Sequence, residues 1–469
     1  MKFHSQSENE NILVLIRTAI RRAKKRKTEI VFSITFPTHI NDVLPLLFHA
    51  DNQNKIRLYW EQPSVGLSFA GLNAVIQLDI SESSSVRDIS KEIETVMANM
   101  VTLNDDDPGI RFIGGHAFNP EGKRDDLIWG HFPRGRFILP ECLAILRDGR
   151  AQLIISGKVN ETDMAEIIHR KFMNICADYE DQLSATFPPS HKVSIEKYRS
   201  SPDKNTYMGI VSSALKFIHS GEVEKVVISR YQHIKSNHRL DMSSALKSLR
   251  NTYSECTSFF FCFPEEGMFL GATPERLIRK NGLSIHTEAL AGTMENDANI
   301  SEDPMLLKIF LSDPKETGEH QHVVNQICKN LKSITSELTK DMTPHLLKLR
   351  NVQHLQTNIS GKLKDDKNIM ELIQILHPTP AVAGTPTRKA LDIILKLELQ
   401  DRGWYSGPLG WLDRYGNGEF VVGLRSALVI EEEVFIFAGS GIVSGSHPEK
   451  EWEETEWKLQ PILNALSGK

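Results

Sequence analysis

Cysteine is scarce in this sequence, and the five cysteines form no recognisable metal-binding or disulfide pattern. Cys142, Cys176, Cys256, Cys262 and Cys328 include no CxxC pair and no spacing with histidine that is typical of a zinc site. Such isolated thiols are typical of proteins kept in a reducing compartment. We therefore expect buried or incidental thiols and, with the polar start MKFHSQSENEN, a cytoplasmic protein.

Long apolar runs and a large net charge are also absent. No apolar run approaches the roughly 18 residues of a membrane span, and the formal net charge is -5 over 469 residues. We therefore expect no membrane partner and no nucleic-acid partner. The basic stretch RRAKKRK at residues 21–27 is interpreted as the solvated end of a helix, with contact to nucleic acid or an anionic membrane as the less favoured alternative.

The length and the mixture of patterns indicate the fold class. A chain of 469 residues exceeds the usual size of a single core. Helical and strand patterns alternate without a βαβ rhythm, which predicts an α/β (α+β) fold with two lobes and large, mostly antiparallel sheets flanked by helices. The Pro- and Ser-rich stretch at residues 185–207 predicts a boundary between residues 1–190 and residues 200–469.

Two acidic stretches, DPKETGEH and HPEKEWEETEWK, have the spacing of helical faces. Glu316 and Glu319 share one face, and Glu451, Glu454 and Lys458 share another. Each ExxE pair alone is more often a solvated face than a site. Two pairs that face each other across a cleft would instead form an oxygen-rich pocket, which suits Mg²⁺. The remaining acids of the second stretch are expected on its solvated side: Glu449, Glu453 and Glu456.

Other candidate residues are individually modest. Lys225 lies in the apolar strand pattern EKVVISR, where it is either a snorkelling edge residue or a base among apolar neighbours. Glu275 in GATPERL is either a helix-start carboxylate or a general acid. The glycine-containing stretches ALAGT and FAGSGIV are expected to be loops whose amides could face a carboxylate, although most such stretches are simply turns. Arg425 and Tyr405 could bind another carboxylate.

The ordered motifs of the second half resemble the chorismate-utilising enzyme family. From about residue 205 to the C-terminus the chain contains, in order, EKVVISR, GATPERL, TEALAGT, KETGEH, VQHLQT, LHPTPAVAGTP, YSGPLGW, GNGEFVVGLRSA and FAGSGIVSGSHPEKEWEETEWKL. The first half resembles the more variable part of the family only loosely. The resemblance implies one large α/β fold, with chorismate as the substrate and Mg²⁺ as the cofactor.

Two positions favour one activity within this family. Members that use water carry a lysine where Lys225 stands, whereas anthranilate synthases have a glutamine. Salicylate synthases, which also eliminate pyruvate, tend to have threonine where this chain has Ala381. The resemblance therefore implies an isochorismate synthase that feeds menaquinone or siderophore synthesis and acts as a monomer. The alternatives are a salicylate synthase and a catalytically silent homologue that binds a carboxylated metabolite.

The resemblance also assigns roles at the reaction centre. Lys225 would take a proton from the water that attacks C2, and Glu275 would protonate the departing C4 hydroxyl. Mg²⁺ would bind the ring carboxylate of chorismate. Its implied ligands are Glu319 and Glu454, with Glu316 and Glu451 alongside or through waters.

The remaining assignments concern the substrate. Tyr405 and Arg425 would hold the enolpyruvyl carboxylate. Lys458 and the amides around Gly439 and Gly441 would add positive potential. The positions matched to the lining of the ring pocket are His354 and Thr293, with Gly292 and Ala381 beside them.

Overall fold

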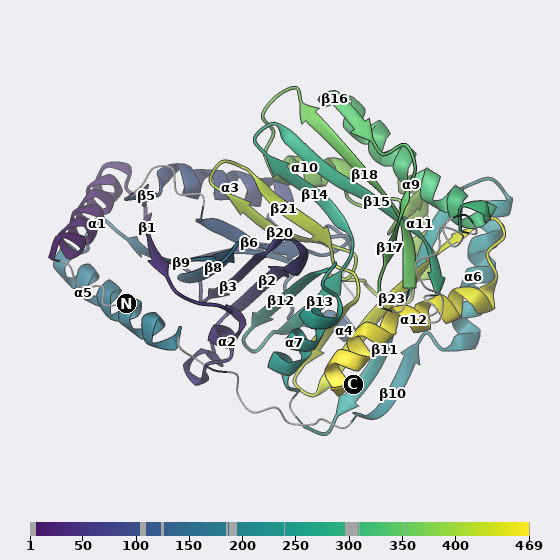
Figure 1. The fold of residues 1–469 in the computed structure, drawn as a ribbon, viewed down its shortest axis with the longest axis horizontal. Helices are drawn as coiled ribbons and strands as arrows, with labels where there is room; N and C mark the ends of the chain where they lie inside the picture. The colour runs from purple at the N-terminus through teal and green to yellow at the C-terminus, as the bar shows by residue number, and fades with distance from the viewer. Residues whose placement is uncertain are drawn as a thin grey trace.

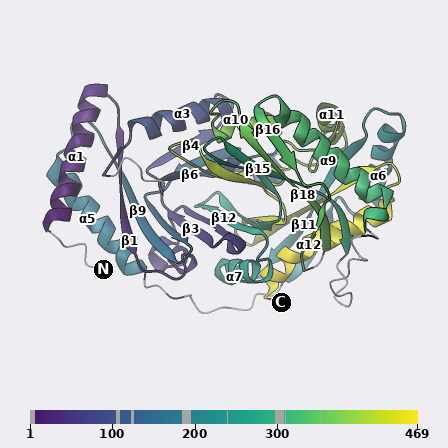
Figure 2. The same ribbon diagram turned by 45° about the horizontal axis from the view of Figure 1, so that its top comes forward.

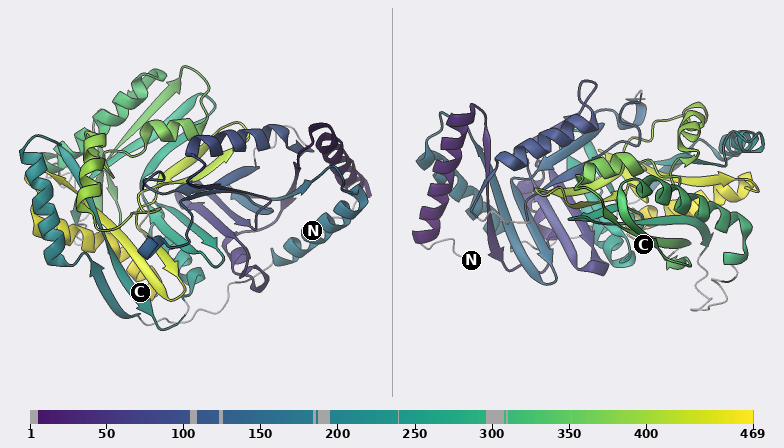
Figure 3. Two further views of the ribbon diagram at one scale, coloured as in Figure 1. Left: turned by 180° about the vertical axis from the view of Figure 1, so that it is seen from behind. Right: turned by 90° about the horizontal axis from the view of Figure 1, so that it is seen from above.

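The computed structural model contains two large β-sheets with helices packed around them (Figure 1). It describes residues 6–103, 109–122, 126–183, 186, 195–238, 240–295, 308, 310–350 and 352–468. The purple and blue elements of the first half lie at one end of the molecule, and the green and yellow elements of the second half lie toward the other end (Figures 2 and 3). Residues 187–194 of the predicted boundary lie outside the described residues.

The first sheet, called sheet A here, has 13 strands within the described residues. In spatial order they are β10 (Ile195–Ser201), β11 (Lys225–Ser236), β23 (Glu433–Val443), β22 (Ser426–Ile430), β13 (Gly267–Thr273), β12 (Thr257–Phe263), β2 (Arg57–Gln62), β3 (Leu67–Leu72), β8 (Cys142–Arg147), β9 (Arg150–Val159), β1 (Ile30–Thr38) and β5 (Val101–Thr102), with β19 (Gly384–Thr385) beside β11. Its pairs are antiparallel except β1 with β5.

The second sheet, sheet B, has 10 strands in the described part of the chain, all paired antiparallel. In spatial order they are β16 (Thr335–Lys340), β18 (Val352–Leu363), β15 (Ser284–Glu295), β14 (Arg276–Asn281), β21 (Gly418–Val422), β20 (Pro408–Asp413), β6 (Arg111–His116), β7 (Gly135–Leu139) and β4 (Ile76–Ile80), with β17 (His345–Lys348) beside β18. Both sheets combine strands from before residue 190 with strands from after residue 200.

Helices pack on the outer faces and ends of the two sheets. The α-helices with bounds in the described part of the chain are α1 (Gln6–Arg26), α2 (Leu44–Leu47), α3 (Val86–Asn99), α4 (Asp126–Trp129), α5 (Ala165–Gln182), α6 (Lys204–His219), α7 (Met242–Thr252), α9 (Pro314–Lys332), α10 (Ile369–Leu376), α11 (Thr387–Leu397) and α12 (Pro448–Ser467). Helix α12 packs on α6, α7 and β23, and α9 packs on β15 and also contacts β23. The mixed, mostly antiparallel architecture confirms the predicted fold class. Within the described residues, no helix is long and apolar enough to cross a membrane.

Sheet A is buried on both faces, which explains its continuous apolar runs. Phe259 and Phe261 of β12 point into the core between the two sheets, together with Trp60 of β2 and Ile113 of β6. Phe260, between them, points to the opposite face, where α1, α5, α7 and α12 cover the sheet. Alternate residues of one strand therefore contribute to two different cores.

Two of the points at which the chain crosses from one sheet to the other are neighbours. Strand β13 of sheet A continues through residues 274–275 into β14 of sheet B, and β21 of sheet B continues through residues 423–425 into β22 of sheet A. The crossings are hydrogen bonded to each other, since the amide of Val422 donates to the carbonyl of Glu275 over 3.0 Å and that of Ala272 donates to the carbonyl of Arg425 over 3.2 Å. These crossings carry two of the predicted site residues, Glu275 and Arg425.

We predict that Phe261→Ala lowers the free energy of unfolding by about 3–5 kcal/mol, because it leaves a cavity in the core between the sheets. Urea denaturation measures the effect. The matched control is Leu395→Ala on α11, whose leucine is 68% exposed and whose loss should change stability by less than about 0.5 kcal/mol. Equal stability of the two variants would contradict the role of Phe261 in this core.

Candidate functional site

The first acidic stretch begins helix α9 as predicted. Asp313 is the N-cap, its side chain accepts from the amides of Lys315 and Glu316, and Pro314 is the first helical residue. Glu316 is buried and accepts a 2.8 Å hydrogen bond from the amide of Thr293 in β15. The adjacent Gly292 has a φ of +77°, a conformation that glycine adopts without strain. The local turn in β15 therefore brings a backbone N–H to a carboxylate of α9.

The second acidic stretch forms the start of helix α12, which is held by a buried arginine. The guanidinium of Arg230 in β11 donates to Thr455 over 2.6 Å, lies 3.7 Å from the ring centroid of Trp452 and pairs with Glu456. Because Arg230 is fully buried, these contacts fix the helix against sheet A. Glu456 is therefore ion-paired and only partly solvated, with 37% of its side chain exposed. Glu449 and Glu453 are exposed, as expected.

Lys225 and Glu319 form an ion pair at the start of β11. The lysine is fully buried, and its Nζ lies 2.7 Å from Oε1 of Glu319. A Cβ atom at Gly441 in the neighbouring strand would lie 2.4 Å from this oxygen and 2.9 Å from Cε of Lys225. The missing side chain of Gly441 therefore makes room for the pair. Although burial opposes it, the charge of Lys225 lowers the pKa of Glu319.

The four predicted metal-site glutamates lie together with three lysines. Burial and repulsion by Glu319 raise the pKa of Glu316 to about 7, and burial and repulsion by Glu454 raise that of Glu451 to about 7. Glu454 is ion-paired to Lys458 in the next turn. The structure thus brings together two pairs of carboxylates from α9 and α12.

These carboxylates fit a divalent cation in donor chemistry. They are hard oxygen ligands, and the space beside Glu319 is kept open by Gly441. Within the described residues, no three acidic, histidine or cysteine side chains converge closely enough to enclose a metal by themselves. A site of this kind suits Mg²⁺, which takes one or two carboxylates and completes its coordination with water and an anionic ligand.

Glu275 is buried at the crossing between β13 and β14. Burial raises its pKa to about 7, with the nearby charge of Lys225 acting in the opposite direction. Its carboxylate accepts a 3.4 Å hydrogen bond from the hydroxyl of Thr379, in the segment between α10 and α11. Ala381, two residues further along that segment, is partly buried against the core between the sheets. Glu275 is thus suited to hold a proton near neutral pH and release it to a reacting group.

Arg425 and His354 form a hydrogen-bonded pair beside this charged cluster. Nη2 of Arg425 donates to Nε2 of His354 over 3.0 Å, and Nδ1 of the histidine lies 3.0 Å from the carbonyl of Gly292. A guanidinium can only donate, so the proton of the neutral ring is assigned to Nδ1. Burial and the charge of Arg425 hold the pKa of His354 well below its ordinary value. Thr293, whose hydroxyl lies 3.3 Å from Nδ1, completes this group.

Tyr405 and the glycines of β23 adjoin Lys458. The Tyr405 ring stacks on Phe437 with centroids 5.4 Å apart, and burial raises its pKa to about 12. Nζ of Lys458 donates to the carbonyl of Gly439 over 3.0 Å. The glycines of ALAGT and FAGSGIV led us to expect loops. This expectation is wrong, because the two stretches are parts of strands β15 and β23. Their amides are therefore largely committed to the sheet ladders, and the glycines serve mainly to leave space.

Three residues of the site were missed from the sequence. Lys315 pairs with Glu316 and Glu451, Thr379 reaches Glu275, and Arg230 holds α12. Lys315 lies inside the motif KETGEH and could have been found there. The other two contacts join residues more than a hundred positions apart, which no local pattern reveals.

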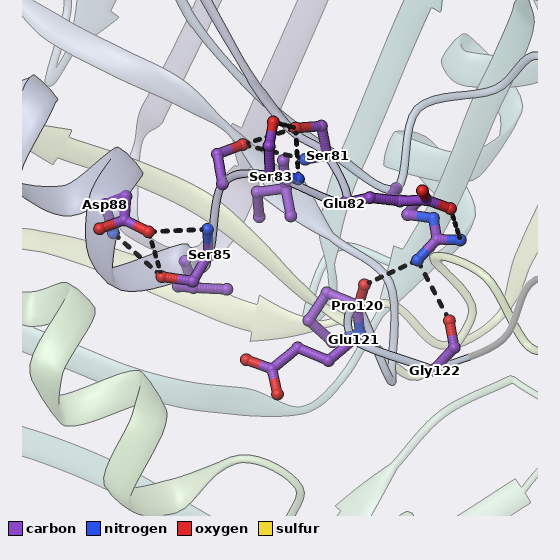
Figure 4. Close-up of a pocket in the computed structure, with 12 residues that line it drawn as sticks. Ser81, Glu82, Ser83, Ser85, Asp88, Pro120, Glu121 and Gly122 are labelled. Atoms are coloured by element: carbon purple, nitrogen blue, oxygen red, sulfur yellow. Dashed lines mark hydrogen bonds and ion pairs between the residues drawn. The ribbon is translucent and has the colours of Figure 1, made fainter.

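A surface hollow of about 910 Å³ lies elsewhere, near the start of α3 (Figure 4). Its polar groups bond to one another: Ser81 and Ser84 share a 3.0 Å hydrogen bond, Ser85 caps α3, and Arg134 donates to the carbonyl of Gly122 over 3.1 Å. None of the predicted site residues lines it. The charged cluster, and not this hollow, is the candidate active site.

We predict that Glu275→Gln changes the pH dependence of stability. The folded-state pKa of about 7 lies above the ordinary 4.5, so the stability contributed by this carboxyl is present below pH 4.5 and is lost as the pH rises through 7. Glutamine does not titrate. From pH 5 to pH 8 the variant should gain on the order of 2 kcal/mol relative to the wild type, as measured by urea denaturation. A difference in the free energy of unfolding between variant and wild type that does not change from pH 5 to pH 8, as we expect for the exposed Glu449→Gln, would contradict the raised pKa of Glu275.

Comparisons with known proteins agree with this geometry. The family model described as "Chorismate binding enzyme" matches residues 18–467. The isochorismate synthase MenF of Bacillus subtilis is 31% identical over 467 residues, covering 96% of each chain. The salicylate biosynthesis isochorismate synthase of Pseudomonas aeruginosa is 31% identical and covers 96% of this chain and 93% of its own. The structure of the menaquinone-specific isochorismate synthase MenF from Escherichia coli superposes with a TM-score of 0.79 at 26% identity, covering 96% of this chain and 100% of that one. The chain therefore belongs to the chorismate binding enzyme family.

Proposed function

We propose that the protein is an isochorismate synthase, which converts chorismate reversibly to isochorismate with Mg²⁺ as cofactor. The observation that carries this proposal is the placement of one buried lysine and one buried carboxyl of raised pKa in the same cluster, close enough for the charge of Lys225 to act on Glu275. The relatives named as isochorismate synthases that match nearly the whole chain support the same activity.

The proposed reaction needs one base and one acid, and its protons balance. Lys225, in its amine form, takes a proton from the water whose oxygen bonds to C2. The ring double bonds shift, and the C4 hydroxyl leaves as water with the proton of Glu275. One C–O bond forms and one breaks, without an oxidant or reductant. Each proton transfer contributes roughly 10² to 10⁴-fold to the rate, and the fixed frame adds orientation.

The charged side chains divide the substrate between them. Arg425 and Tyr405 would bind the enolpyruvyl carboxylate, since Arg425 is held in place by His354. Glu319 and Glu454, on facing helices, would hold Mg²⁺, with Glu316 and Glu451 beside them. The bound ion would supply positive charge to the ring carboxylate. Thr379 would keep the Glu275 carboxyl in position.

The physiological setting is proposed from the same observations. We propose a monomer as the active form. All five cysteines are free, which supports a cytoplasmic protein. The menaquinone-specific MenF structure matches the whole chain better than the structure of the 2,3-dihydroxybenzoate-specific DhbC of Bacillus anthracis, with TM-scores of 0.79 and 0.70. A role in menaquinone synthesis is therefore favoured over one in siderophore synthesis.

We predict that purified protein converts chorismate to isochorismate in the presence of Mg²⁺, as followed by liquid chromatography. Lys225→Ala and Glu275→Ala should each lower kcat by at least about 10²-fold, because each removes one proton transfer. Lys235→Ala is the matched control, since this lysine lies on the same strand and its side chain is 66% exposed.

The product mixture distinguishes the alternatives. Absence of isochorismate in the wild-type reaction would refute the proposal, and circular dichroism would show whether an inactive variant is still folded. Pyruvate and salicylate formed without an added lyase would instead identify a salicylate synthase. Binding of chorismate without turnover would identify a silent homologue.

We predict that Glu454→Gln raises the Mg²⁺ concentration needed for half-maximal turnover by at least about tenfold, because it removes one of two direct ligands. Glu453→Gln, one position earlier on the exposed side of α12, should leave the Mg²⁺ titration unchanged. Identical titrations for the two variants would speak against the metal role of Glu454.

A further inference from the structure

The proposed reaction uses two of the three lysines in the carboxylate cluster and leaves the third without a role. Nζ of Lys315 lies 3.0 Å from Oε1 of Glu451 and 3.3 Å from Oε1 of Glu316. Its side chain is 24% exposed, whereas that of Glu451 is 1% exposed. The ammonium thus reaches from the first turn of α9 to a fully buried carboxylate of α12.

The three ammonium groups divide the four carboxylates into an inner and an outer set. Lys225 pairs with Glu319, and Lys458 pairs with Glu454. These glutamates are the inner set. Lys315 alone serves the outer set, Glu316 and Glu451. Burying a carboxylate without a counter-charge costs free energy. The charge of Lys315 therefore lowers the free-energy cost of burying the outer set in the folded protein.

The ammonium group of Lys315 also disfavours the binding of a second cation at the outer carboxylates. It lies within ion-pair distance of both and so bridges the two carboxylates itself. Its positive charge also opposes any divalent ion held by the inner set. The charges of both helices therefore favour one bound ion, not two.

We propose that Lys315 is a resident cation of the glutamate cluster: it joins α9 to α12 without metal and confines a single divalent ion to Glu319 and Glu454, each of which would exchange its own ammonium partner for the ion. Lys315 is a positioning residue in this scheme, because it contacts the carboxylates and not the reacting atoms. The statement about metal affinity rests on the proposed use of Mg²⁺, whereas the joining of the helices does not.

The first experiment tests the joining of the helices in the absence of metal. In EDTA, Lys315→Met should lower the Tm by at least about 3 °C relative to the wild type, because Glu451 loses its counter-charge. Lys315→Arg should restore most of the Tm, and Lys315→Met combined with Glu451→Gln should restore it as well, because neither leaves a buried charge unpaired. The control is Lys329→Met, which replaces an exposed lysine of the same helix. A Tm for Lys315→Met equal to that of the control would overturn the proposal.

The second experiment tests metal binding directly by titration calorimetry with MgCl₂. The wild type should bind one ion per chain, and Lys315→Met should bind Mg²⁺ on the order of tenfold more tightly or take up a second ion, since a unit positive charge has been removed. Unchanged affinity and stoichiometry in Lys315→Met would overturn the metal part of the proposal. Failure of the wild type to bind Mg²⁺ would count against the proposed function, while the EDTA experiment would still decide the role of Lys315 between the helices.

Discussion

The pairing of opposite charges in a buried space is the constraint on which the rest of this structure depends. Four carboxylates and three ammonium groups meet where α9, α12 and the start of β11 converge. Charges of one sign alone could not remain ionised there, because desolvation would neutralise them. The cluster exists only because each carboxylate has an ammonium partner, and the surrounding elements hold those partners at fixed positions.

The two sheets provide that fixed frame. Sheet A is covered on both faces, so its strands cannot shift without disturbing two cores. Arg230 joins this sheet to α12, and the amide of Thr293 in sheet B joins β15 to α9. The helices that carry the acidic residues are thus each tied to a sheet by a hydrogen bond to a side chain or a carboxylate, in addition to their apolar packing.

Local signals in the sequence were sufficient to predict where the helices begin and which residues share a face. They were insufficient to predict the contacts between elements. The Asp313-Pro314 start of α9 and the stripe of Glu451, Glu454 and Lys458 follow from capping and helical period, and both are present. The glycines of β15 and β23 were interpreted as loop signals, because glycine is commonest in turns. Their actual role is to leave space for side chains of other segments, such as Glu319 beside Gly441, and only the tertiary structure shows this. The same holds for Glu456, whose partner Arg230 lies 226 positions earlier.

The crossings that carry Glu275 and Arg425 set these two residues apart from the glutamates of the candidate site. Glu275 and Arg425 lie on crossings that are hydrogen bonded to each other, so their backbones are held side by side. The glutamates of α9 and α12 belong to separate helices, joined to each other in this cluster by side-chain charges. The distance between the helices and the crossings therefore depends on side-chain charges and packing and not on the hydrogen-bond ladders of the sheets.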